Sequence, residues 1–188
     1  MKLKISILSL IFMLVSFQGT FAQDEKLTPP SQGKAVIYFL RTTGLGALMN
    51  FRFFEKSNYL GKFNGMNYIR VECDPGKSVF WVKAENIDFI ETEVEAGKIY
   101  LVEANAVMGG FSAGVKFKLV DYDDEKQMKR IYKLLEKRDV KTFAPEELEA
   151  DRKEMPLVIQ RGMRTVQKKR AKGKRIKYLT PDMDYKKN

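Results

Sequence analysis

Between residues 33 and 121, short apolar and aromatic runs alternate with turn residues. Such runs lie at residues 34–41, 50–56, 59–64, 67–73, 78–84, 89–95, 99–106 and 114–120. Runs rich in β-branched and aromatic residues, bounded by Gly, Pro, Asn or Asp, are typical of strands. The short connections predict a mainly β domain, either an antiparallel β-sandwich of about seven to eight strands or a barrel-like arrangement, and we adopt the sandwich.

The order of hydrophobic and polar positions within these runs indicates which strands have a solvent-exposed face. Residues 90–95 alternate apolar residues and Thr92 with glutamates, and residues 115–119 alternate apolar residues with lysines. This period of two is expected of strands that have one face in the core. Residues 35–40, Ala-Val-Ile-Tyr-Phe-Leu, do not alternate and therefore predict a central strand covered on both faces.

After residue 124 the apolar period becomes helical. Residues 125–137 predict a helix with one apolar stripe, which packs on the sandwich. A second helix is expected to begin near Pro145, and Pro156 should break or kink it. The polar end, residues 182–188, is expected to be poorly ordered. The apolar stripe of the first helix consists of Met128, Ile131, Tyr132 and Leu135, and Ile159, Met163 and Val166 recur at helical spacing beyond Pro156.

The N-terminus has the pattern of a secretory signal peptide. Lys2 and Lys4 precede an apolar run at residues 5–17, and small residues stand at positions 20 and 22. The run is too short to span a bilayer, so we predict cleavage after Ala22, a linker at residues 23–32 and no transmembrane helix afterwards. No cysteine lies near the cut for a lipid anchor. The mature chain is expected in the periplasm, on the cell envelope or outside the cell.

Charge divides the mature chain into two halves. Residues 23–123 carry a net charge of −1, and residues 124–188 a net charge of +9. We therefore separate a β-sandwich domain at 33–121 from a helical basic extension at 122–188. The excess is concentrated in a run without acidic residues that contains Arg161, Arg164, Lys168, Lys169, Arg170, Lys172, Lys174, Arg175 and Lys177.

This basic run is the main candidate for binding. Clustered cations attract anionic surfaces, so the candidate partners are an anionic lipid, lipopolysaccharide, a cell-wall polymer or another envelope protein. The alternative is a solvated basic helix that only keeps the protein soluble. Nucleic acid is disfavoured, because an exported protein seldom meets it and no aromatic residue interrupts the run before Tyr178.

Two glycine-containing motifs resemble nucleotide sites but fail on spacing. Gly76-Lys77-Ser78 could end a phosphate-binding loop, yet Val71 stands where the loop needs glycine and the next residues predict a strand. Gly-Lys also recurs at residues 33, 61 and 97, so we interpret the pair as a turn followed by a strand. A Gly-x-Gly in residues 42–49 is likewise followed by a predicted strand, whereas a dinucleotide site needs a helix there.

The glycine-rich loops 42–49 and 108–114 support an alternative, a module that binds a small ligand. Their apolar residues, which could contact a partner or tuck inward, are Leu45, Leu48, Met49 and Phe111.

Catalysis and cofactors are disfavoured by composition. The chain has no histidine and a single cysteine, which excludes histidine-activated nucleophiles and thiolate metal clusters. Cys73 shares the period-two pattern of its run and is interpreted as a core residue. The acidic run 121–125 could bind a hard cation but lacks the glycine and spacing of an EF-hand loop. We predict a non-enzymatic protein without a cofactor, and an enzyme using carboxylates stays as a further alternative.

Several stretches together resemble one bacterial family. Residues 33–41, 58–63, 68–71, 74–77 and 95–100 resemble the domain of unknown function 2846 family, exported or lipoprotein-type envelope proteins with a β-sandwich domain. The resemblance covers about residues 33–121 and implies fold and compartment only. This chain lacks the lipidation cysteine, and its basic extension is not explained by the resemblance.

The signal peptide generates a direct prediction. Mass spectrometry of the mature protein from its native envelope should find Gln23 as the first residue, because the peptidase cuts after small residues such as Ala22. A mature protein that still carries Met1 or Lys2 would contradict the assignment.

Overall fold

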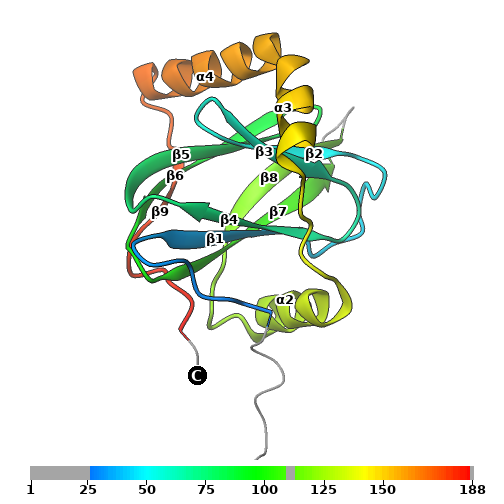
Figure 1. The fold of residues 1–188 in the computed structure, drawn as a ribbon, viewed down its shortest axis with the longest axis vertical. Helices are drawn as coiled ribbons and strands as arrows, with labels where there is room; N and C mark the ends of the chain where they lie inside the picture. The colour runs from blue at the N-terminus through cyan, green and yellow to red at the C-terminus, as the bar shows by residue number, and fades with distance from the viewer. Residues whose placement is uncertain (1–25, 109–112, 187–188) are drawn as a thin grey trace, which may run out of the picture.

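Two β-sheets pack face to face, and helices cover their outer faces (Figure 1). The computed structural model describes residues 26–108 and 113–186. The strand order is β4-β1-β7-β8 in the first sheet and β3-β2-β5-β6-β9 in the second. The mainly β fold with C-terminal helices confirms the predicted class. The strands are β1 (Ala35–Leu40), β2 (Phe51–Glu55), β3 (Asn58–Phe63), β4 (Tyr68–Cys73), β5 (Gly76–Lys83), β6 (Ile87–Val94), β7 (Ile99–Met108), β8 (Ala113–Leu119) and β9 (Lys177–Leu179).

Both sheets are mixed, whereas the pattern predicted antiparallel pairing throughout. β1 pairs antiparallel with β4 but parallel with β7, and β6 pairs parallel with β9. The chain leaves the first sheet after β1, returns for β4, leaves again and returns as β7. Because β4 already occupies one edge of β1, β7 joins the other edge. A pairing between strands so distant in sequence cannot be read from local alternation.

The core between the sheets is aromatic and is centred on β1. The ring centroid of Phe39 lies 5.5 Å from those of Phe53, Phe80 and Phe117, so a first-sheet residue contacts second-sheet strands as well as β8. All six residues of β1 are buried. Inward residues contribute to the core between the sheets and outward residues to the packing beneath a helix. The prediction of a central strand covered on both faces is confirmed.

Helix α2 (Glu125–Lys137) covers the outer face of the first sheet, within the bounds that the sequence predicted. Its first turn is capped by Asp124, whose carboxylate accepts the backbone N–H of Gln127 at 2.9 Å. At its other end, Lys26 Nζ donates to the backbone carbonyl of Arg138 at 3.0 Å. The helix buries Met128, Ile131, Leu134 and Leu135 against Tyr38, Leu40, Tyr68 and Leu101.

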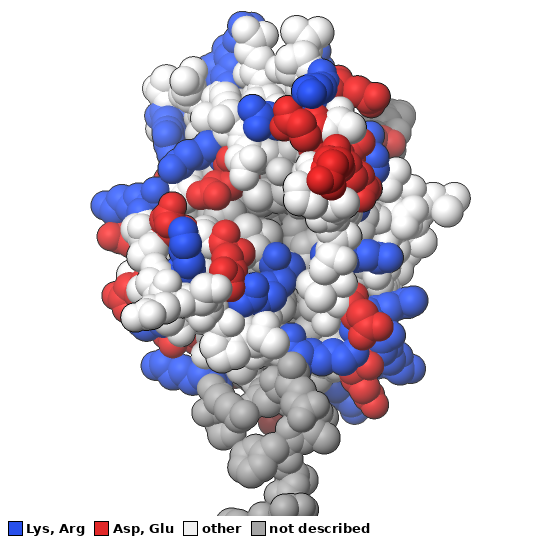
Figure 2. Space-filling model, viewed as in Figure 1, with Lys and Arg blue, Asp and Glu red and all other residues white. Residues whose placement is uncertain are grey.

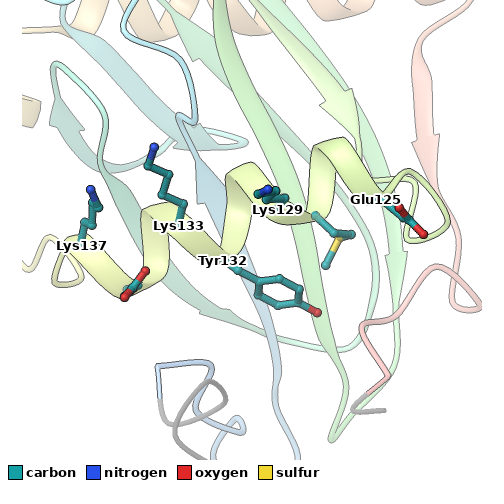
Figure 3. Close-up of a pocket in the computed structure, with 7 residues that line it drawn as sticks. Glu125, Lys129, Tyr132, Lys133 and Lys137 are labelled. Atoms are coloured by element: carbon teal, nitrogen blue, oxygen red, sulfur yellow. The ribbon is translucent and has the colours of Figure 1, made fainter.

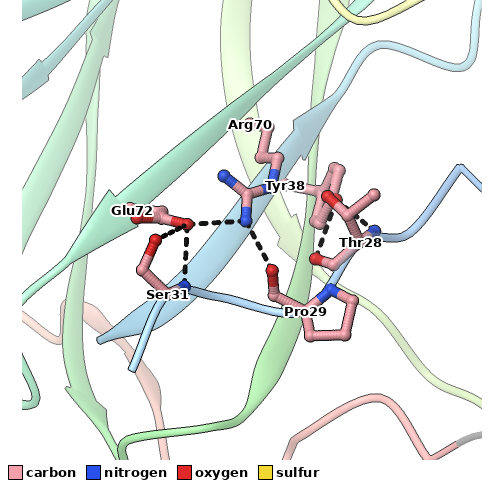
Figure 4. Close-up of polar contacts among 6 residues, drawn as sticks. All are labelled: Thr28, Pro29, Ser31, Tyr38, Arg70 and Glu72. Carbon is pink, nitrogen blue, oxygen red and sulfur yellow. Dashed lines mark hydrogen bonds and ion pairs between the residues drawn. The ribbon is translucent and has the colours of Figure 1, made fainter. Parts of the chain in front are cut away.

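The segment that follows residue 25 is held on β1 and β4 (Figure 4). The backbone N–H of Thr28 donates to Tyr38 Oη at 2.8 Å, and the Arg70 guanidinium donates to the carbonyl of Pro29 at 2.7 Å. Arg70 also donates to Glu72 Oε1, at 2.7 Å. The described part of the predicted linker is therefore tied to the first sheet by polar contacts on both strands.

Helices α3 (Pro145–Lys153) and α4 (Pro156–Ala171) cover the outer face of the second sheet (Figure 1). The predicted break at Pro156 is confirmed, since α3 ends before it and α4 begins with it. Beneath α4, the rings of Phe54 and Trp81 stack with centroids 3.8 Å apart. A Cβ at Gly162 would lie 2.5 Å from a ring atom of Trp81. The absence of a side chain at this position lets the helix approach the indole.

The C-terminal segment adds a strand that the sequence did not predict and packs where disorder was expected. β9 extends the second sheet at the free edge of β6. Beyond it, the backbone N–H of Tyr185 donates to the carbonyl of Ile99 at 2.7 Å, and Tyr122 Oη donates to that of Met183 at 3.3 Å. The expectation of poor order is therefore wrong for residues 182–186, because these contacts fix them on the first sheet. Residues 187–188 lie outside the described residues.

Replacing Gly162 tests the contact between α4 and the second sheet. Gly162→Ala should lower the free energy of unfolding by about 1–3 kcal/mol, because the new methyl group overlaps Trp81 and the helix must lift. The same substitution in an unconstrained helix would raise stability by up to about 1 kcal/mol. Urea unfolding measured by circular dichroism, with fluorescence of the single tryptophan, gives the sign. Gln167→Ala, an exposed position on α4, is the control, and a stabilised Gly162→Ala protein would rule out the close contact.

Candidate functional site

The structure divides the nine predicted basic residues into two groups. Members of the first group form ion pairs with carboxylates on β6. Arg170 Nε lies 2.6 Å from Glu91, and Lys177 Nζ lies 2.9 Å from Asp88. Lys169 Nζ lies 4.0 Å from the other oxygen of Asp88 and 4.9 Å from the centroid of the Phe89 ring. These three cations therefore help to hold α4 and β9 on the sheet. A count of charges in the sequence cannot distinguish such structural cations from cations that bind a partner.

The second group faces solvent. Within the described residues none of its six members forms an ion pair. Four of them lie on α4 or at its C-cap at intervals of three or four residues, which places them on one face of the helix. We call Arg161, Arg164, Lys168 and Lys172 the basic stripe. The six solvent-facing members are Arg161, Arg164, Lys168, Lys172, Lys174 and Arg175.

The basic stripe lies on the side of α4 that does not contact the sheet. Gly162 and Val166, on the inner side, are buried against the second sheet. Leu157, at the start of the helix, is 74% exposed and lies one turn before Arg161 on the same face as the stripe. Figure 2 shows Lys and Arg side chains along the end of the molecule where α4 lies, and acidic side chains over α3. The stripe is therefore presented away from the rest of the protein.

The positive charge on the outer side of α4 has no compensating acidic residue on the same helix. The helix sequence PLVIQRGMRTVQKKRA contains no acidic residue. Like charges three or four residues apart weaken an isolated helix, so this arrangement is unfavourable by itself. Its stability comes from the buried inner face and from the ion pair between Arg170 and Glu91. The outer cations remain available to an anionic partner.

A groove of about 500 Å³ runs along α2, but its lining carries both signs of charge (Figure 3). Tyr132 projects to one side of the helix, and Lys133 and Lys137 project to the other. Glu125 and Glu136 lie among the lining cations. The two glutamates oppose an anion here, whereas α4 carries no acidic residue, so the basic stripe is the better candidate for a broad anionic surface.

Loop 42–49 is fixed by the buried Arg41. The guanidinium donates to the carbonyls of Met49 and Leu45, both at 2.8 Å, and to that of Gly46 at 2.5 Å. It also lies 4.1 Å from the centroid of the Phe51 ring. Burial lowers the pKa of Arg41 from its ordinary value. Since three loop carbonyls bind one side chain, the loop has a defined shape.

The predicted loop contacts differ in exposure. Leu45 is exposed and Leu48 is 91% exposed, whereas Met49 is partly buried against the core. Phe111 lies outside the described residues. A Cβ at Gly46 would lie 3.4 Å from that of Ala106, so the loop lies beside the end of β7. The small-ligand alternative stays a prediction.

The two motifs set aside from sequence have structural roles. Gly76 and Gly97 have φ angles of +105° and +80°, which agrees with the predicted turns. β5 begins at Gly76, so a strand stands where a phosphate-binding loop would need a helix. In the acidic run, Asp124 caps α2. No group of three or more metal-ligating side chains occurs within residues 26–108 and 113–186.

Sequence reasoning missed a second group of cations. Arg52, Lys62 and Lys83 each appear in the sequence as a single polar position within a strand. Strand register places them side by side on the outer face of the second sheet. The alternation of their strands indicates the face, but only the register brings them together.

Models of known protein families give no match to this sequence, and a search of curated proteins finds no similar sequence either. The resemblance to the domain of unknown function 2846 family therefore stays a prediction. Among the described helices, none combines the length and apolar character needed to cross a bilayer.

The single thiol belongs to the core. Cys73 is 5% exposed and packs between the sheets, as the sequence predicted. Burial, followed by the nearby carboxylates of Glu55 and Asp74, raises the pKa of Cys73 to about 12. Only the thiolate is a good nucleophile, so the folded protein should not use this group in chemistry.

Thiol labelling tests this interpretation. At pH 8 the reaction of Cys73 with iodoacetamide should be at least about 1,000-fold slower in the folded protein than in urea, because the raised pKa lowers the thiolate fraction and burial blocks access. The neutral thiol favours the folded state below the unfolded pKa, and this contribution is lost as the pH rises toward the folded pKa. Equal labelling rates in the two states would show that Cys73 is accessible.

Proposed function

We propose that this protein is an exported, non-enzymatic binding module that docks on an anionic component of the cell envelope through the basic stripe of α4. The partner is an anionic phospholipid, lipopolysaccharide, a cell-wall polymer or an acidic face of an envelope protein. One observation carries the proposal: the stripe has no acidic residue on its helix and no intramolecular ion pair among the described residues.

Rigidity of the stripe supports a docking role. α4 is held from below by the contact between Gly162 and Trp81, and from the side by the ion pair between Arg170 and Glu91. The backbone positions of the exposed cations are thus fixed before any partner arrives. A pre-organised surface loses less conformational entropy on binding than a flexible tail. The alternative, a basic helix that only keeps the protein soluble, does not require the cations to be fixed in this way.

Export supports an envelope partner over a cytoplasmic one. The signal peptide expected at residues 1–22 lies outside the described residues, and its assignment rests on the sequence. We propose that the mature protein is periplasmic, envelope-associated or extracellular. Anionic lipids and cell-wall polymers are abundant partners for a cationic surface in these locations.

Charge removal from the stripe tests the docking function. The triple variant Arg164→Gln, Lys168→Gln and Lys172→Gln should bind phosphatidylcholine vesicles containing phosphatidylglycerol at least about tenfold more weakly at low salt. Each cation near an anionic lipid surface contributes up to about 1 kcal/mol, and salt reduces this contribution. Co-sedimentation with the vesicles, with and without the anionic lipid, measures the partitioning.

A matched control exists on α2. Lys126, Arg130 and Lys133 are exposed and lie on one helix face. Like the three residues changed in the stripe, they are two lysines and one arginine. Changing all three to Gln alters the net charge equally and should change vesicle binding much less. If both triple variants bind equally well, or lose binding equally, the stripe has no special role and only net charge acts.

A further inference from the structure

A row of cations crosses the outer face of the second sheet. Arg52 on β2 pairs in register with Lys62 on β3 on one side and with Lys83 on β5 on the other. Residues paired across antiparallel strands have neighbouring side chains on the same face, and like charges in such pairs repel. All three side chains are partly buried. The sheet therefore carries an unfavourable concentration of positive charge at this point.

Only one member of the row is neutralised. Lys62 Nζ lies 3.0 Å from Asp151, whose carboxylate also accepts the hydroxyl of Tyr59 at 3.0 Å. Lys83 Nζ donates to a backbone carbonyl, that of Ala84, at 2.7 Å. Within the described residues, neither Arg52 nor Lys83 has a carboxylate at ion-pair distance. Two cations are thus left without a counter-charge.

The pKa values agree with this geometry. Burial, followed by repulsion from Arg52 and Arg161, lowers the pKa of Lys83. Although burial alone would raise it, the hydrogen bonds from Lys62 and Tyr59 hold the pKa of Asp151 below its usual range. The Asp151 carboxylate is therefore already engaged, and the positive charge beside it is in excess.

A cavity of about 300 Å³ opens above this row. Its floor is formed by the three cations, and its other side is formed by the junction of α3 and α4. Asp151, Glu154, Met155 and Val158 complete the lining. α4 begins here with no acidic residue in its first turn and no side-chain cap, so its N-terminus adds partial positive charge. The exposed Glu154 is the one lining group that would oppose an anion and has no ion-pair partner among the described residues.

We infer that this cavity binds one phosphate group, held by the Arg52 guanidinium and the Lys83 ammonium with Lys62 beside them. Guanidinium geometry matches two phosphate oxygens, and a lysine supplies a point charge. Two cations without a carboxylate at ion-pair distance, together with a helix N-terminus, suit the charge of a phosphate monoester better than that of a single carboxylate. The site lies beneath the N-terminal end of α4, whereas the basic stripe lies on its outer face. The inference therefore goes beyond the proposed docking function and does not depend on it.

Calorimetry with inorganic phosphate tests the pocket. The wild-type protein should release or absorb heat in titrations at constant ionic strength, and the variants Arg52→Gln and Lys83→Gln should each bind phosphate at least about tenfold more weakly. Glu154→Gln should bind phosphate more tightly, because the opposing carboxylate is removed. The double variant Arg130→Gln and Lys133→Gln on α2 is the control for lost positive charge and should bind as the wild type does.

A stability measurement guards against misfolded variants. In phosphate-free buffer, Arg52→Gln and Lys83→Gln should have melting temperatures equal to or above that of the wild type, because each removes a like-charge repulsion. Phosphate should raise the melting temperature of the wild type but not of these two variants. No binding by the wild type, or unchanged phosphate binding by both variants, would overturn the assignment.

Binding to two kinds of lipid vesicle distinguishes a lipid headgroup from a soluble phosphate as the ligand. Phosphatidylcholine vesicles carrying phosphatidic acid present a phosphate monoester, whereas those carrying phosphatidylglycerol present a diester. A lipid headgroup as ligand predicts that the wild type prefers phosphatidic acid and that Arg52→Gln loses this preference. Binding of inorganic phosphate without such a preference assigns the pocket to a soluble phosphate. The triple variant of the stripe should lose binding to both vesicles but keep its affinity for inorganic phosphate, which separates failure of the pocket from failure of docking.

Discussion

The rest of the structure depends on one constraint: each of the two sheets carries large buried apolar side chains on both faces. In β1, alternate residues contribute to the core between the sheets and to the surface beneath α2, and all six are buried. In the second sheet, Phe54, Trp81 and Phe89 point away from that core and would lie in water without α3 and α4. Because large exposed apolar surfaces are unfavourable in water, we expect the two sheets to be unstable without helices α2, α3 and α4. The residues after 121 are therefore part of the packing of the fold.

This requirement also decides which cations can bind a partner. The inner side of α4 must be apolar and small, and Gly162 over Trp81 allows the closest approach. Cations at its edge find Asp88 and Glu91 on β6 and are used to hold the helix and β9 in place. Among the described residues, the cations on the outer side form no intramolecular ion pair. The division between structural and available cations thus follows from the geometry of packing.

The sequence predicts the features that depend on local periodicity and misses those that depend on register. Helix α2 and three of the four residues of its predicted stripe follow from spacing, although Leu134 is buried in the structure and the predicted Tyr132 only partly. Short apolar and aromatic runs between turn residues locate the eight strands before residue 121. β9 was missed because Lys177, Tyr178 and Leu179 form no apolar run, and they become a strand only because β6 offers a free edge. The pairing of β1 with β7 joins segments about sixty residues apart, with two visits to the other sheet between them. For the same reason, the basic run was visible in the sequence, but its ion pairs and the row of Arg52, Lys62 and Lys83 were not.

Net charge per segment is consequently a poor guide to where an anion is attracted. The first half of the mature chain is almost neutral, yet register concentrates three of its cations in one cavity. The second half is strongly basic, yet it contributes Asp151 and Glu154 to that same cavity. The two positive features also differ in their surroundings. Salt screens the exposed stripe over about 10 Å at 0.1 M ionic strength, whereas charges partly enclosed by protein are screened less. An excess of cations within one fold therefore gives two kinds of surface: a broad one suited to a charged interface and a small one suited to a single anionic group.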